Sequence, residues 1–484
     1  MRSTSAGSPI YKIRDKVSVI IYSGNILVKS TYLKKLTLRR KTAQDSKLSF
    51  ANQLLELSAI VQKQQQKAKS EIIDIRDESL REEVLQKSLS LSDDICLEQL
   101  DKLRKIGSSL RNQISPEVIE VFQKIGFLGN KKPEPSLSFT EDIEEEDAQS
   151  PILWDMMHEK GQREFDDVLD ERNWERFWGF RVPITHWIIG RDPSEEIRLK
   201  NAFSAIHEDL NFAIKEEKLL QRNFSKEHHQ SLAEAFKLQV NEELKRKLID
   251  EIKVQSWWET CKPKLNPNHW LKYYIEELTL ETSPRTATRW TEDTLISIFK
   301  NCQKNYDLLH FACHCEVSDT SEFLSVLNMK VAGVLIPLDV ATIANELIPD
   351  ENDDDEEIDS DDENRSGRLV FLNACDSGAE SSSHAPPGFP DKWIQCQNAS
   401  AVIVTLCKIP DYFAYAFAEK FYENLFKDIT QQDNISYVSE ALLETRRYFM
   451  EKHQNPLGLA YVLYAREEAH IKADFFSTTT LSSL

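Results

Sequence analysis

Reactive side chains follow two apolar runs of the chain. One run, RLVFLNA (368–374), is followed directly by Cys375. Another, YDLLHFA (306–312), is followed two residues later by His314. In nucleophilic cysteine catalysis a thiolate attacks, and a nearby imidazole lowers the pKa of the thiol or takes its proton. If the two runs are neighbouring strands, Cys375 and His314 form such a pair, and the DSG turn after Cys375 aims backbone N–H groups at an oxyanion.

Two other interpretations fit these residue types. A free cysteine after a strand is commonly a core residue. Zinc binding is the second interpretation, with ligands drawn from Cys302, His310, Cys313, His314 and Cys315. The CHC spacing is tighter than that of the usual zinc knuckle, and the sequence has no CxxC pair to complete a site. In an extended strand Cys313 and Cys315 share one face and His314 lies on the other.

The elements around these residues predict an α/β fold. SAVIVTLC (400–407) is a third apolar run, and helical stretches are expected at 389–397, 410–426 and 433–452. Apolar runs that do not alternate, separated by helices, are typical of a parallel sheet covered on both faces. Ligands of such sheets bind beyond the carboxyl ends of the strands, where Cys375 and His314 stand.

The amino-terminal part has its own pattern. VSVIIY and ILVK, around Ser-Gly-Asn, predict a hairpin over residues 16–29. Residues 48–126 are expected to be helical, with an apolar stripe formed by Cys96, Leu100, Leu103, Ile106 and Leu110. Short strands are expected at 136–139 and 182–189, and a helical segment at 210–250.

Composition restricts the class of protein. The chain has 484 residues and a formal charge of −20, which argues against nucleic acid or an anionic membrane as direct partners. Residues 350–363 hold eleven acids and no base, and predict a solvated insertion, with a divalent-cation site as the alternative. No apolar run reaches the ~18–20 residues of a membrane span, and the start has no signal-peptide pattern. We therefore expect a cytoplasmic protein with reduced thiols, and no cofactor or resident metal.

Two motifs resemble those of the CHAT family, which are caspase-like cysteine peptidases related to caspases and separase. HFACHC (310–315) resembles the family's H-F-A-x-H-G motif, and RLVFLNACDSG (368–378) resembles its cysteine motif. The similarity continues through LNFAIKEEKLL (210–220) and NPLGLAYVLYAR (455–466), and covers about 150–466.

The resemblance implies a caspase-like three-layer α/β/α sandwich with a mostly parallel sheet, preceded by a β-hairpin and a helical lead-in. Three parts follow. Residues 1–130 form the hairpin and helical region, 131–260 a pseudo-caspase half, and 261–484 the catalytic half with the acidic insertion at 350–363.

The resemblance also implies residue roles. His314 is the general base, Cys375 is the nucleophile, and the backbone N–H groups of Cys315 and Cys375 form the oxyanion hole. His310 is then structural. Two positions differ from related enzymes: Cys315 stands where the family has glycine, and Asn373 stands where basic-specific metacaspases have an acid.

The predicted function is that of a cysteine endopeptidase of clan CD that cleaves protein substrates, in a regulated bacterial defence (antiviral) or cell-death pathway. A sensor protein is the expected activating partner. The alternative is a catalytically silent CHAT-like scaffold that binds proteins.

Overall fold

The computed structural model describes the following parts of the chain: residues 17–22, 25–29, 36–37, 40–112, 137–141, 154–159, 174–188, 194–224, 226–235, 238, 296–298, 305–316, 325–331, 334–345, 367–374, 388–427, 435–465 and 469–472. Cys302, Cys375 and the acidic run at 350–363 lie outside the described residues.

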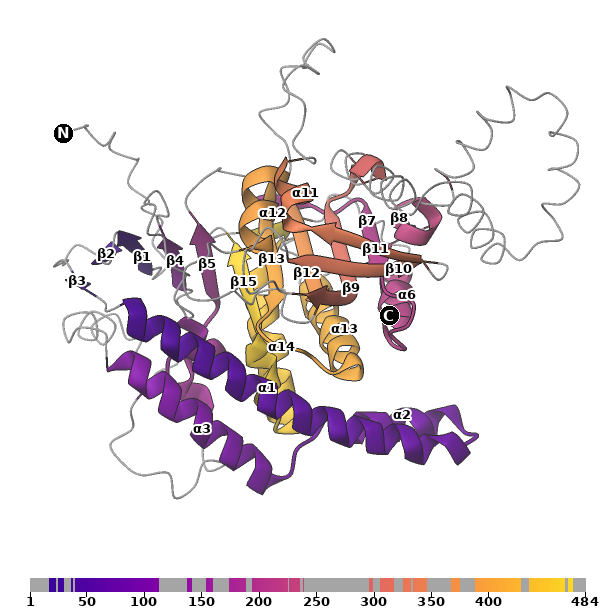
Figure 1. Ribbon diagram of the computed structural model, residues 1–484, viewed down its shortest axis with the longest axis horizontal. Coiled ribbons are helices and arrows are strands. Elements are labelled where there is room, and N and C mark those ends of the chain that lie inside the picture. The colour runs from indigo at the N-terminus through magenta and orange to yellow at the C-terminus, as the bar shows by residue number, and fades with distance from the viewer. Residues whose placement is uncertain are drawn as a thin grey trace, which may run out of the picture.

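A central sheet of 13 strands dominates the described part of the chain (Figure 1). Its main path has the order β11-β10-β9-β12-β13-β15-β5-β4-β1-β2-β3; off this path, β7 pairs with β9 and β8 pairs with β7. Its strands are β1 (Val17–Tyr22), β2 (Asn25–Lys29), β3 (Leu36–Thr37), β4 (Leu137–Glu141), β5 (Ile184–Ile188), β7 (Ala202–Ile206), β8 (His229–Ser231), β9 (Leu308–Glu316), β10 (Val326–Val331), β11 (Val334–Asp339), β12 (Arg368–Ala374), β13 (Ala399–Thr405) and β15 (Tyr461–Ala465). A separate small sheet has the order β14-β16-β6 and consists of β6 (Glu196–Arg198), β14 (Ile435–Tyr437) and β16 (His470–Lys472).

The large sheet consists mainly of two parallel groups. Strands β8, β7, β9, β12 and β13 run in one direction. Strands β15, β5, β4 and β1 run in the other, and the groups meet at the antiparallel pair β13–β15. Every residue of β12 and β13 is buried, as expected for strands covered on both faces. The predicted mostly parallel sheet is confirmed.

The helices of the described residues surround this sheet. They are α1 (Arg40–Glu71), α2 (Glu78–Lys87), α3 (Asp93–Arg111), α5 (Trp178–Arg181), α6 (Ala213–Asn223), α11 (Val340–Asn345), α12 (Phe389–Gln397), α13 (Asp411–Lys427) and α14 (Val438–His453), with 3-10 turns η1 (Ile72–Asp74), η2 (Trp154–Met156) and η9 (Pro456–Ala460).

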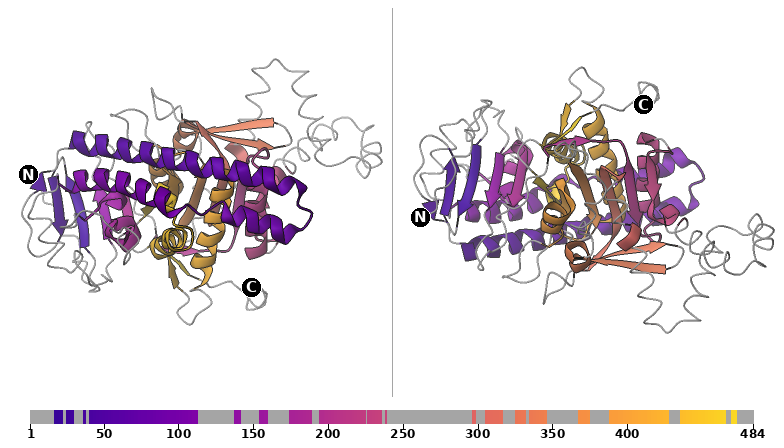
Figure 2. Two further views of the ribbon diagram at one scale, coloured as in Figure 1. Left: turned by 90° about the horizontal axis from the view of Figure 1, so that it is seen from below. Right: turned by 90° about the horizontal axis from the view of Figure 1, so that it is seen from above.

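Helices cover both faces of the sheet (Figure 2). On one face His310 of β9 packs against Tyr422 of α13. On the other face the next residue, Phe311, packs against Trp393 of α12. Because successive residues of a strand point to opposite faces, α13 and α12 form two layers with the sheet between them. The three-layer α/β/α fold is therefore confirmed.

The amino-terminal helices α1 and α3 lie across the end of the sheet toward which β9, β12 and β13 run (Figure 1). The predicted apolar stripe of α3 is confirmed, because Cys96, Leu100, Leu103 and Leu110 are buried. The hydroxyl of Ser58 in α1 donates to the backbone carbonyl of Lys408, just beyond β13. This contact fixes α1 beside the carboxyl ends of the strands.

Two predictions for the region before the motifs have opposite outcomes. The hairpin is confirmed, with β1 and β2 paired antiparallel from Ser18–Lys29 to Tyr22–Asn25. The uninterrupted helical segment expected at 210–250 is wrong, because α6 ends at Asn223 and β8 follows it. β8 pairs with β7, so a tertiary contact overrides local helix propensity there.

Among the described helices, none has the length and apolar character needed to cross a membrane.

Candidate active site

Strand β9 places its reactive side chains on two faces. Cys313 and Cys315 are buried on one face, whereas the His314 side chain between them is exposed. His310 lies four residues before His314 on the same face and is fully buried. The face assignment predicted from strand alternation is confirmed.

The register of β9 and β12 brings the two motifs together. In this parallel pair Asn373 lies opposite Ala312, and Ala374 lies opposite Cys313. The next residue on β9 after Cys313 is His314, and the next residue in the sequence after Ala374 is Cys375. Cys375 itself is outside the described residues, so its role remains a prediction.

A pocket of about 410 Å³ opens at these strand ends, within the roughly 300–1,000 Å³ typical of small-ligand sites. Its walls come from α1, the ends of β9 and β12, α6, and the segment from β13 into α13. The lining residues are Ser58, Gln62, Leu210, Glu216, Ala312, Cys313, His314, Cys315, Glu316, Asn373, Ala374, Thr405, Lys408, Ile409, Pro410, Asp411 and Ala414.

His314 has a second histidine beside it. The ring of His207 meets the His314 ring edge to face, with 4.6 Å between the centroids. His207 follows β7, and its N–H donates to the carbonyl of Ala312 at 2.9 Å. Burial, and then the neighbouring His314, lower the pKa of His207. We did not predict His207 from sequence, although its place after the apolar run AFSAI is the same signal that indicated His314.

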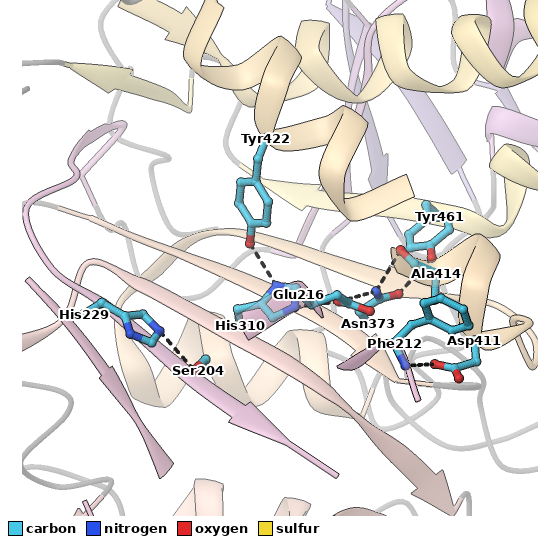
Figure 3. Close-up of polar contacts among 10 residues, drawn as sticks. All are labelled: Ser204, Phe212, Glu216, His229, His310, Asn373, Asp411, Ala414, Tyr422 and Tyr461. Atoms are coloured by element: carbon cyan, nitrogen blue, oxygen red, sulfur yellow. Dashed lines mark hydrogen bonds and ion pairs between the residues drawn. The ribbon is translucent and has the colours of Figure 1, made fainter. Parts of the chain in front are cut away.

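A buried hydrogen-bond network lies deeper on the same face (Figure 3). Glu216 Oε2 accepts two hydrogen bonds, one from His310 Nε2 at 2.7 Å and one from Asn373 Nδ2 at 2.7 Å. His310 Nδ1 lies 2.9 Å from the Tyr422 hydroxyl, and the Tyr461 hydroxyl donates to Asn373 Oδ1 at 2.8 Å. His310 is therefore a structural residue, as predicted.

One assignment of protons satisfies every group in this network. Tyr422 donates to His310 Nδ1, and His310 Nε2–H donates to Glu216. Burial raises the pKa of Tyr422 well above its usual value, so the phenol keeps the proton that it donates. Asn373 presents its amide nitrogen to Glu216 and to the Ala414 carbonyl, since its oxygen would be repelled by both.

Glu216 was also not predicted from sequence. It lies on the buried side of the amphipathic helix α6, together with Ala213, Leu219 and Leu220. An acid in an apolar stripe was the available signal, because such an acid must find buried donors. Its donors come from β9 and β12, 94 and 157 residues away along the chain.

Cys315 occupies ordinary strand backbone. Among the described residues other than glycine, those with positive φ are Asn398 and Gln454. Cys315 is therefore not in the left-handed region that would require glycine, and its side chain introduces no backbone strain.

The zinc interpretation does not fit this geometry. Both ring nitrogens of His310 are bonded to Glu216 and Tyr422, and His314 points away from Cys313 and Cys315. Among the described residues there is no group of three or more His, Cys, Asp or Glu side chains that could hold a metal ion.

Comparison with known proteins finds a family model for the carboxyl-terminal part of the chain. Residues 272–470, which carry both motifs, match the family model of the CHAT domain. This part of the chain is similar to a CHAT domain. The match extends from before β9 to the first residue of β16, so it includes the strands β9 and β12 of the candidate site.

No curated protein matches the chain. Among solved structures, the Arg-specific cysteine proteinase gingipain R aligns at 11% identity over 73% of this chain and 67% of its own, with a TM-score of 0.36. Separase, in its Saccharomyces cerevisiae complex with securin, aligns at 12% identity over 95% of this chain and 30% of its own, with a TM-score of 0.36. The similarity to the CHAT domain rests on the family model over residues 272–470.

Proposed function

We propose that this CHAT-domain protein is a cysteine endopeptidase, with Cys375 as nucleophile and His314 as general base. The observation that carries the proposal is the placement of His314. Its ring is exposed at the end of β9 and lines the pocket. His314 follows Cys313, and Cys313 pairs with Ala374, the residue before Cys375. Among the described residues no side chain or backbone group is hydrogen-bonded to this imidazole, so a nitrogen is available to accept a proton.

The proposed reaction has two steps. His314 takes the thiol proton of Cys375, and the thiolate adds to a peptide carbonyl. The backbone N–H groups of Cys315 and Cys375 stabilise the oxyanion. The C–N bond then breaks, the amine leaves with the proton from His314, and a thioester remains. Water, deprotonated by His314, adds to the thioester, the C–S bond breaks, the carboxylic acid product leaves, and the proton on His314 returns to the sulfur of Cys375.

The biological setting belongs to the same proposal. We infer a role in a regulated bacterial defence or cell-death pathway, with a sensor protein as activating partner, on the resemblance to the CHAT family alone. Unstrained backbone at Cys315 favours an active enzyme over the silent scaffold, because substitution of the family's glycine imposes no distortion there.

Cleavage of a peptide library by the wild type, Cys375→Ala and His314→Ala tests the mechanism. We expect each substitution to reduce kcat/KM by at least about 10³-fold, and the double variant to be no worse than either single one. Cys396→Ala is the matched control, since this partly exposed cysteine lies on α12, away from the pocket.

Iodoacetamide labelling gives a second measurement. We expect fast alkylation at Cys375 in the wild type, and slower alkylation in His314→Ala, because the thiolate is the reactive form. Unchanged turnover in Cys375→Ala would disprove the mechanism. Absence of cleavage together with slow alkylation of Cys375 would favour the scaffold.

A further inference from the structure

The pocket beside His314 has an acidic floor. Glu216 is 2% exposed and is one of the residues that line the pocket. His310 and Asn373 both bind Oε2, and within the described residues no hydrogen bond is made to Oε1. The network therefore orients the carboxylate and leaves one oxygen for a ligand.

No Lys or Arg forms an ion pair with Glu216 within the described part of the chain. Its donors are the amide of Asn373 and the imidazole of His310. A buried carboxylate is costly to desolvate unless an opposite charge approaches it. A cationic ligand would supply that charge.

The other charged groups of the lining also give the pocket more negative than positive charge. Asp411 and Glu316 add two carboxylates, and Lys408 is the cation of the lining and is exposed. Asp411 lies in the first turn of α13, where its charge offsets the positive end of the helix dipole. Its Oδ2 is 3.9 Å from Lys69 Nζ, and burial raises its pKa.

The pocket also adjoins the reacting position. His314 and Ala374 both line it, and Cys375 follows Ala374. A substrate side chain that enters the pocket must therefore belong to a residue next to the scissile bond.

We propose that this pocket binds an arginine or lysine side chain on the amino side of the scissile bond, with the Glu216 carboxylate as its counter-charge. The proposal rests on the peptidase function proposed above and adds its substrate class. Asn373 is a positioning residue here, since its amide holds Glu216 Oε2. Position 373 is asparagine where basic-specific metacaspases have an acid, and in this proposal Glu216 of α6 supplies the negative charge instead.

Substrates alone give the first test, without any variant. Two peptides differ by arginine or by citrulline, its uncharged near-isostere, before the scissile bond. We expect the wild type to prefer arginine by about 10²-fold or more in kcat/KM, as for a charge partner in a dry site. Equal cleavage of the two peptides would overturn the proposal and leave the peptidase function intact.

Glu216→Gln gives the second test. The glutamine oxygen can still accept from His310 and Asn373, so the network is kept while the charge is lost. We expect the preference for arginine over citrulline to fall to a few-fold, with citrulline cleavage within a few-fold of the wild type. Glu83→Gln is the matched control, because this exposed carboxylate on α2 pairs with Lys87 and is not among the residues that line the pocket. An unchanged preference in a folded Glu216→Gln protein would contradict the assignment.

Binding separates failure of the pocket from failure of the chemistry. Calorimetry with agmatine, a decarboxylated arginine, is carried out on Cys375→Ala, which is not expected to cleave anything. We expect binding that is weakened at least 10-fold by adding Glu216→Gln. Binding without any cleavage by the wild type would refute the peptidase and keep the cation-binding pocket. Cleavage without agmatine binding would refute the pocket assignment and keep the peptidase.

Discussion

The rings of His207 and His314 meet edge to face, with their centroids 4.6 Å apart. His207 comes from the end of β7 and is buried, whereas His314 comes from β9 and is exposed. The buried ring thus supports one side of the proposed general base. Burial and the proximity of His314 lower the pKa of His207, so this neighbour favours its neutral form.

We expect His207→Ala to lower kcat about 10-fold and to leave KM nearly unchanged, because His314 loses the ring that orients it. His207→Phe keeps an aromatic edge at this place and should restore most of kcat. Steady-state kinetics on one peptide measure both values. A loss in His207→Phe as large as that in His207→Ala would show that the imidazole itself, rather than ring packing, is needed.

Asn373→Asp should destabilise the protein at neutral pH. The introduced carboxyl would lie at the position from which the amide donates to Glu216 across 2.7 Å. Two adjacent carboxylates cannot both ionise readily, so the pKa of one is raised in the folded state. An acid with a raised folded pKa loses stability as pH rises above its unfolded pKa.

The deficit of Asn373→Asp should therefore grow from about pH 4 to pH 7, and reach roughly 2 kcal/mol in the free energy of unfolding. Urea denaturation across this range measures it. Asn373→Ala is the control, and its deficit should vary far less with pH. A deficit of Asn373→Asp that is constant with pH would argue against charge repulsion at Glu216.

Gly107→Ala should destabilise the fold, although alanine is normally the better helix residue. A Cβ at this position in α3 would lie 2.2 Å from the backbone oxygen of Met156 and 3.1 Å from His158 Cβ. Overpacking of this kind costs about 2–3 kcal/mol, more than the ~1 kcal/mol of improved helix propensity. Thermal unfolding would show it as a lower Tm. Ser109→Ala, at an exposed position of the same helix, should leave Tm unchanged or slightly raised.

Stability should fall as the solution is acidified below about pH 6.5. Burial lowers the pKa of His229 to about 4, while its hydrogen-bond partner is the Ser204 hydroxyl at 3.1 Å. A histidine with a lowered folded pKa contributes stability above its unfolded pKa, and that contribution is lost as pH falls toward the folded value. Burial lowers the pKa of His453 to about 4 in the same sense.

For His229 alone the loss at pH 5 is about 2 kcal/mol relative to neutral pH. His229→Gln should remove that part, so that the free energy of unfolding between pH 7 and pH 5 changes less than in the wild type. Chemical denaturation at a series of pH values measures this. An unchanged slope in His229→Gln would show that the pKa of His229 is the same in the folded and unfolded states.

Local sequence alone determined the strands that carry the site. RLVFLNA was predicted as a strand over 368–374 and β12 has those bounds, because an apolar run that does not alternate is stable only inside a covered sheet. Alternation along β9 separated His314 from Cys313 and Cys315, since a two-residue period is a property of any extended chain. The two motifs likewise indicated the CHAT family before any contact was known.

Tertiary structure decided what surrounds His314. Glu216 of α6 lines the same pocket as His314, and His207 contacts the His314 ring because β7 adds to the sheet beside β9. Local pattern marks Glu216 only as an acid on an apolar helix face. Its partners are His310 and Asn373, which are distant in sequence. Chain order does not specify which strand ends meet, because strand order is decided by the burial of whole faces. The assembled sheet is what brings Glu216 into the pocket that His314 lines.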